Sequence, residues 1–167
     1  MTGGDGGLER VGPERAGELL GTLERGQSAA HEQLAGALGP YALQAAIAAC
    51  HARAPTADET DWTRITALYD ALAQLTQSPV VNVNRAVAYT MAFGPAAGLE
   101  IADALQSEPA LATYHLLPTV RGDFLFKLGR FEEARAEFER ALGLTRNARE
   151  RDLLRTRAAA CARGPTP

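Results

Sequence analysis

The 167-residue sequence contains only two cysteines and no excess of basic residues. Cys50 and Cys161 lie far apart and match neither the ligand spacing of a zinc site nor a disulfide framework. We therefore expect two free, buried thiols in a reducing cytoplasm, and no bound metal.

The charge balance argues against a nucleic-acid-binding protein. The chain has 17 lysine and arginine residues against 20 aspartate and glutamate residues, which gives a net charge of -3. A protein that grips a phosphate backbone usually carries a basic excess. We therefore expect no direct contact with nucleic acid.

Long apolar runs are absent as well. No stretch approaches the roughly 18 consecutive apolar residues that a membrane span needs. The first residues, Met1 to Gly7, have neither the basic start nor the apolar stretch of a signal peptide. These absences predict a cytoplasmic protein that does not contact a membrane.

What the sequence does contain is typical of a globular helical domain. Apolar residues make up 46% and charged residues 22%, and the length suffices for one domain with its own core. Glycine and proline divide the chain at regular intervals, and alanine, leucine, glutamate and arginine fill the segments between them. The fold class is therefore all-α, with antiparallel helix pairs. We expect one domain over 13–162, with flexible tails over 1–12 and 163–167.

The glycine and proline positions that divide the chain predict a succession of helices. Val80, Val83 and Val87 have helical spacing, which favours a helix over a strand for the valine-rich run after Pro79. The segment from Tyr41 to Arg53 is so apolar that we expect it to be buried on most sides. The expected ranges are Pro13–Leu38 (one long or two short helices), Tyr41–Arg53, Trp62–Leu75 after a Thr60 or Asp61 cap, Pro79–Gly94 after a Ser78 cap, Pro95–Gln106, Ala110 or Ala112 to Lys127, Phe131–Leu144, and Ala148–Ala162 after an Asn147 cap.

One helix pair resembles a tetratricopeptide (TPR) unit. In the run from Pro118 to Asn147, Gly122 occupies the small position at which the first helix lets the second approach. Leu128-Gly129 closes the first helix, and Phe131, Ala134, Phe138 and Ala141 follow in the order aromatic, small, aromatic, small. A weaker unit spans Val80 to Asp103, with Ala96 at the aromatic and Leu99 at the small position. Because one repeat cannot bury its own face, we expect a short TPR-like solenoid.

The sequence contains no constellation that predicts catalysis. Cys50 and His51 are neighbours on a helix and point about 100° apart, so they form no nucleophile–base pair. Of the other histidines, His31 and His115, we expect His115 to be a hydrogen-bonded packing residue rather than a metal ligand. The acidic residues Glu132, Glu133, Glu137 and Glu139 are expected on the solvated face of their helix. We expect no enzyme, no cofactor and no metal site, and a helical hydrolase or metal-dependent enzyme is the least favoured alternative.

The sequence does contain candidate residues for binding a partner. In TPR-type arrays, the first helix of each pair lines a groove in which polar residues hold a peptide. Asn84 and Arg85 interrupt an apolar run, and they either bond a neighbouring loop or face that groove. Arg121 either pairs with an acid such as Asp70 or Asp103 or points into the groove. Trp62 and Tyr69 share one side of their helix, either in the core or as aromatic anchors for a partner.

The order and spacing of several runs resemble one known group of proteins. These runs are Gly39–Ala52, Asp61-Trp62, Leu68–Asp70, Ser78–Val81, Asn84–Ala88, Gly94–Leu99 and Tyr114–Leu117. They are similar to the C-terminal extension of a group of extracytoplasmic-function RNA polymerase sigma factors, a TPR-like helical domain that follows the two sigma domains. The resemblance covers about Gly39 to Cys161, and nothing in the chain resembles the sigma domains themselves.

The resemblance implies a regulatory interaction domain in bacterial transcription initiation. Its groove would bind a peptide or helix of a sigma factor's core domains, of RNA polymerase or of a regulator, with Asn84, Arg85, Arg121, Trp62 and Tyr69 as contacts. Promoter recognition does not carry over, because the DNA-reading domain is missing. The alternatives are a truncated remnant without a partner and a helical scaffold that self-associates into a homo-oligomer.

Overall fold

The structure is a computed structural model that describes residues 39–163. Residues 1–38 and 164–167 lie outside the described part. The helix predicted over 13–38, the predicted N-terminal tail and most of the predicted C-terminal tail therefore lie outside it too.

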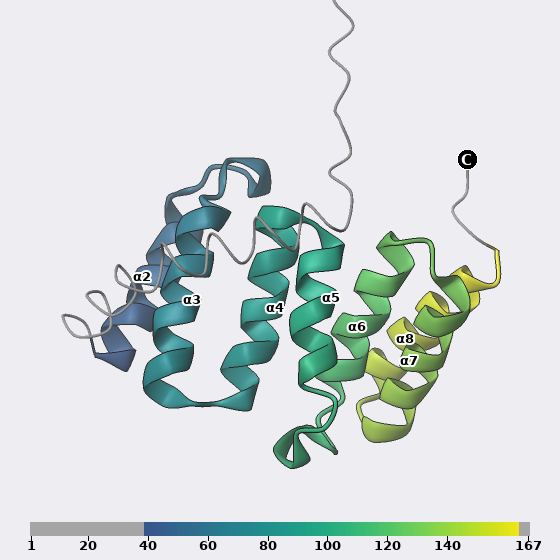
Figure 1. Cartoon of the computed structure of the whole chain (residues 1–167). Coiled ribbons are helices and arrows are strands. Elements are labelled where there is room, and N and C mark those ends of the chain that lie inside the picture. The colour runs from purple at the N-terminus through teal and green to yellow at the C-terminus, as the bar shows by residue number, and fades with distance from the viewer. Residues whose placement is uncertain (1–38, 164–167) are drawn as a thin grey trace, which may run out of the picture.

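Residues 39–163 fold into helices alone, as the sequence predicts, and this part of the chain contains no strand. Successive helices pack against each other as antiparallel neighbours along a single array (Figure 1). The α-helices are α2 (Pro40–Arg53), α3 (Trp62–Thr76), α4 (Pro79–Phe93), α5 (Pro95–Ala104), α6 (Leu116–Lys127), α7 (Phe131–Leu144) and α8 (Ala148–Cys161), and two short 3-10 helices, η1 (Ala57–Glu59) and η2 (Pro109–Leu111), lie in the connections. The all-α fold of packed helix pairs is confirmed.

Local signals set most helix starts. The side chain of Asp61 accepts a hydrogen bond from the backbone N–H of Arg64 at 2.9 Å, and Asn147 caps α8 in the same way. Proline occupies the first turn of α2, α4 and α5, where its missing N–H costs nothing. The turn between α6 and α7 places Gly129 at a φ of 77°, which glycine adopts without strain.

The start of α6 differs from the prediction. The sequence indicated a helix from Ala110 or Ala112, whereas α6 begins at Leu116. Pro109 instead begins the 3-10 helix η2, in which the Glu108 side chain accepts a hydrogen bond from the Ala110 N–H. This turn buries Leu111 in the core before the chain reverses into α6, so a tertiary contact replaces the first turns of the predicted helix.

The core consists of two clusters. One cluster joins α2 and α3 around Leu43, Ile65 and Leu72, and it reaches α4 at Ala88. The larger cluster runs from α4 to α8 and includes the fully buried ring of Phe138. Buried residues therefore continue from one helix pair to the next, as expected for a solenoid.

Two glycines allow the closest helix contacts. A Cβ atom on Gly122 in α6 would lie 2.6 Å from the Phe138 ring of α7, so the predicted small position is confirmed. In α5, the helix equivalent to α7, the close contact is made by Gly98, where a Cβ atom would lie 2.6 Å from the carbonyl oxygen of Ala86 in α4. The prediction that Leu99 holds this position is wrong by one residue. Because α5 begins at Pro95 and α7 at Phe131, Gly98 is the fourth residue of its helix, as Ala134 is of α7.

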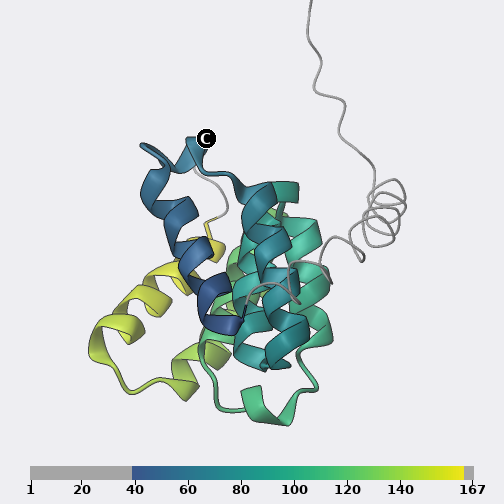
Figure 2. The same ribbon diagram turned by 90° about the vertical axis from the view of Figure 1, so that its left-hand side faces the viewer.

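The packing of α2 also departs from the prediction. Only Leu43 and Ile47 of this helix are buried among the described residues. Tyr41, Ala45 and Ala48 are exposed, so the expectation of burial on most sides is not met there. The physical reason is position, because α2 stands at the end of the array beside α3 (Figures 1 and 2).

Candidate interaction surface

The first helices of successive pairs carry equivalent stripes, of which the one on α4 is exposed and the one on α6 is partly exposed. On α4, this stripe consists of Val80, Asn84, Val87 and Met91, whose spacing places them on one helix face. On α6, the equivalent residues 36 positions later are Leu116, Val120, Asp123 and Lys127. The helices α4 and α6 also contact each other directly. We call these eight residues the A-helix face.

The A-helix face is apolar over much of its length. Val80, Val87, Met91 and Leu116 are between 36% and 44% exposed, and Val120 is half-buried. Asn84 lies exposed in the middle of the α4 stripe, where its amide can both donate and accept hydrogen bonds. The α4 stripe, which is apolar with one central polar group, suits a helix or an extended peptide better than a small charged ligand. The α6 stripe adds the charged residues Asp123 and Lys127.

Arg85 turns away from this stripe and holds two helices together. Its Nε donates a hydrogen bond to Asp70 Oδ1 of α3 at 2.5 Å, and its guanidinium lies over the Tyr89 ring. The Tyr89 hydroxyl donates to Asp70 Oδ2 at 2.9 Å. The three side chains therefore form a partly buried link between α3 and α4. Of the two roles predicted for Arg85, the structure shows a bond to a neighbouring part of the chain rather than a place in the groove, but the partner lies in helix α3 and not in the predicted loop.

This link makes stability depend on pH in the alkaline range. Burial, and next the negative charge of Asp70, raise the pKa of Tyr89 from 10.0 to about 12. The unfolded chain therefore loses the tyrosine proton first, and the folded state loses stability as the pH rises from 10 through 12. We expect Tyr89→Phe to lose less stability over this interval than the unaltered chain, as measured by urea unfolding at pH 9 and pH 12. Tyr41→Phe is the control, because that side chain is 88% exposed; an equal effect of both variants would refute the assignment.

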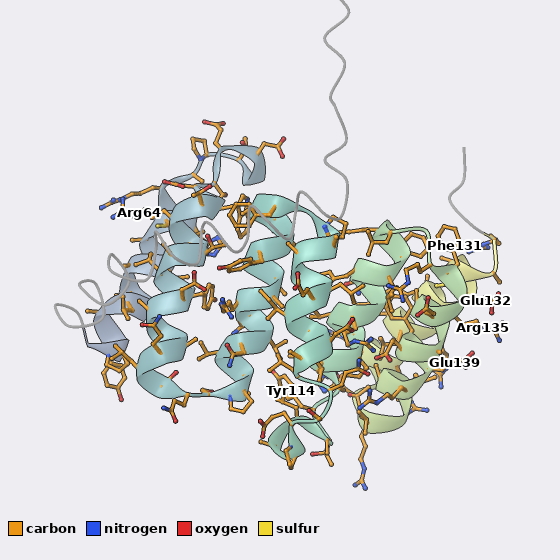
Figure 3. All side chains as sticks on the ribbon, viewed as in Figure 1. Arg64, Tyr114, Phe131, Glu132, Arg135 and Glu139 are labelled. Carbon is orange, nitrogen blue, oxygen red and sulfur yellow. The ribbon has the colours of Figure 1, made fainter. Side chains whose placement is uncertain are left out.

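Arg121 forms the most buried charged link. Its Nη2 donates to Asp103 Oδ1 of α5 at 2.6 Å, and its Nη1 lies 2.5 Å from Glu137 Oε1 of α7. The predicted ion pair with Asp103 is thus confirmed, and Arg121 connects three helices. Glu137 is half-buried by this contact, so its predicted place on the solvated face is wrong. The outer face of α7 carries Glu132 and the exposed Arg135–Glu139 pair instead (Figure 3).

A third arginine, which the sequence analysis does not name, completes a series of helix-joining arginines. Arg157 of α8 pairs with Asp123 of α6 at 2.7 Å. Burial raises the pKa of Asp123, and Arg157 only partly offsets this effect. Arg85, Arg121 and Arg157 are each 36 residues apart, and each is followed by a small residue, Ala86, Gly122 or Ala158. This repeated Arg-small pair was the sequence signal for the helix-joining residues.

Trp62 and Tyr69 belong mainly to the packing of α2 on α3. Both are half-buried against the cluster around Leu43. The Trp62 ring contacts the ring of His51 in α2 edge-on, with centroids 5.3 Å apart, and burial raises the pKa of Tyr69. The core alternative of the sequence analysis therefore describes them better than the role of free aromatic anchors.

The described residues offer no metal centre. Within residues 39–163, no three His, Cys, Asp or Glu side chains come together as a metal would need. Cys50 and Cys161 are both free thiols, and burial raises the pKa of Cys161.

Over residues 39–163, no helix has the length and apolar character to cross a membrane.

In comparison with known proteins, the chain is similar to part of a longer protein. No family model matches the sequence, and no solved structure matches it. The chain is 47% identical over 117 residues to an uncharacterized protein of Rhizobium meliloti (strain 1021). These residues are 70% of this chain and 27% of the relative, so the chain spans about a quarter of the length of that protein.

Proposed function

We propose that the chain is a non-catalytic interaction domain, related to the C-terminal module of extracytoplasmic-function sigma factors and acting in the cytoplasm. It binds an apolar peptide or helix of a sigma factor, of RNA polymerase or of a regulator, and so influences transcription initiation. The observation that carries this proposal is the exposed A-helix face. Three apolar side chains of α4, Val80, Val87 and Met91, stay exposed together with Leu116 of α6. Exposed apolar patches of this kind mark binding surfaces.

The polar residues have two different roles in this proposal, one in partner contact and one in holding helices together. Asn84 is the polar contact for the partner, since it lies in the exposed α4 stripe. Arg85 and Arg121 act indirectly, because their contacts with Asp70 and Asp103 hold α4 and α6 against the preceding helices. Trp62 and Tyr69 position α2 and α3 and are not part of the partner surface.

The relative from Rhizobium meliloti supports a modular origin. About three quarters of that protein lies outside the part that this chain spans. This leaves room for further domains beside the helical array, as the resemblance to a sigma-factor extension requires.

The proposal is tested by placing a charge on the A-helix face. We expect immobilised chain to retain RNA polymerase or a sigma factor from a lysate of the source cell, and Val87→Asp or Met91→Asp to reduce retention at least about tenfold. A carboxylate in an apolar contact loses its hydration without gaining a partner. Both positions are exposed, so the melting temperature should stay within a few degrees.

Leu153→Asp is the matched control, because Leu153 is an exposed leucine on α8 outside the A-helix face. Equal loss of retention in all three variants would contradict the proposed surface. If nothing is retained by a monomeric chain, the remnant alternative is favoured. A mass that rises with concentration, with no protein retained, favours the self-associating scaffold.

A further inference from the structure

The A-helix face has a continuation on α8. Arg121 and Arg157 are 36 residues apart, and each pairs with an acid of an earlier helix, which gives the register between α6 and α8. With the same spacing, the stripe of α6 is followed by four exposed residues on α8 and in the turn after it, namely Asp152, Thr156, Ala159 and Arg163. The surface therefore changes from apolar on α4 to increasingly polar on α6 and α8.

Both acids of the α6 and α8 stripes already have a partner. Nη1 of Arg157 donates to the two carboxylate oxygens of Asp123 at 2.8 and 2.7 Å. Nη1 of Arg155 donates to Asp152 Oδ1 at 2.8 Å. A basic partner would therefore have to compete with an arginine of this chain for either carboxylate.

The two cations of these stripes differ from the acids. Lys127 and Arg163 are exposed, and neither forms an ion pair within residues 39–163. Burial raises the pKa of Asp123, and Lys127 offsets this effect less than Arg157 does. The acid Glu132 lies on the outer face of α7 instead (Figure 3). Among the described residues, the stripes thus offer two unpaired positive charges and no unpaired negative charge.

We propose that the A-helix face takes a partner segment that is apolar where it meets α4 and acidic where it meets Lys127 and Arg163. This inference rests on the proposed function and adds the charge of the partner to it. Val87 and Met91 contact the apolar part, and carboxylates of the segment accept hydrogen bonds from the two cations. Opposite charges across an interface fix the register and suppress wrong partners. Because the whole chain carries a net charge of -3, this attraction is local and orients the segment rather than speeding its approach.

A library of random peptides displayed on phage provides the probe. Peptides are selected on the unaltered chain and counter-selected on Val87→Asp, so that those kept bind the A-helix face. We expect them to combine apolar residues with aspartate or glutamate, and to bind Lys127→Glu/Arg163→Glu at least about tenfold more weakly, because like charges then meet. The control is Arg146→Glu/Arg149→Glu, which changes the net charge equally at two exposed arginines outside the stripes and should bind as the unaltered chain does.

The outcomes separate this inference from the proposed function. Peptides that need Val87 but bind Lys127→Glu/Arg163→Glu as tightly as the unaltered chain, or that carry basic residues in place of acids, would overturn the inference alone. Equal weakening by both double variants would overturn it too, because net charge would then explain the effect. If no selected peptide depends on Val87, the proposed function fails and the inference with it. All four charge reversals are at exposed positions, so both melting temperatures should stay within a few degrees.

Discussion

Gly98→Ala is expected to reduce the free energy of unfolding by about 3 kcal/mol or more, a large part of the stability of a domain of this size. The added Cβ would lie 1.8 Å from Thr90 Oγ1 and 2.6 Å from the carbonyl oxygen of Ala86. Thr90 can rotate its side chain, although its hydroxyl now donates to the Ala86 oxygen at 3.1 Å. The Ala86 oxygen belongs to the α4 backbone, so it yields only if α4 and α5 separate.

Urea unfolding with circular dichroism measures this loss. Gly143→Ala is the control, because a Cβ at Gly143 meets nothing within 4 Å. Since alanine favours the helix by up to about 1 kcal/mol over glycine, this control should be neutral or stabilising. Adding Thr90→Ala to Gly98→Ala should restore only part of the loss, because the backbone contact remains. Full restoration would show that the close approach of the two backbones is not the cause.

Arg121→Met is expected to cost about 3 to 5 kcal/mol of unfolding free energy. The change keeps an apolar side chain of similar length and removes the charge that pairs with Asp103 and Glu137. Only 14% of the Glu137 side chain is exposed, and after the change only Arg140, 3.9 Å from Glu137 Oε2, would still face its carboxylate. The loss follows from this poorly compensated buried charge rather than from missing packing.

The matched variant for this prediction is Arg135→Met. Arg135 lies on the outer face of α7, where it pairs with Glu139 at 2.8 Å and both side chains are more than half exposed (Figure 3). Its removal should leave the urea midpoint unchanged, because exposed pairs are screened by water. Adding Glu137→Gln to Arg121→Met should recover part of the stability. If the double variant is as unstable as Arg121→Met alone, the uncompensated carboxylate is not responsible.

Much of the fold follows from local signals. Asp61 and Asn147 cap helices through bonds to backbone groups two or three residues away, and Pro79 and Pro95 start helices through their own ring geometry. These effects need no distant partner, so the helix starts that depend on them could be predicted from the sequence. The close contact at Gly122 could be predicted for a similar reason, since Gly122, the following turn and Phe138 all lie within one repeat.

The candidate site was predicted less completely. The sequence indicates Asn84 as a polar residue in an apolar run, and the structure leaves it exposed on the A-helix face. Arg85 interrupts the same run, yet it lies one residue further round the helix and reaches Asp70 of α3. Helical spacing predicts that two adjacent residues point about 100° apart, but which of them faces α3 depends on how the helices pack.

The all-helical fold, the capped starts of α3 and α8, and the close contact at Gly122 follow from local patterns in the chain. The packing of distant helices brings Gly98 close to the backbone of α4, pairs Arg121 with both Asp103 and Glu137, and leaves α2 an open face within the described residues. The two groups of features differ in the distance along the chain over which their interactions act. Caps and helix periodicity act over a few residues, whereas ion pairs and burial depend on which distant helices the packing brings together.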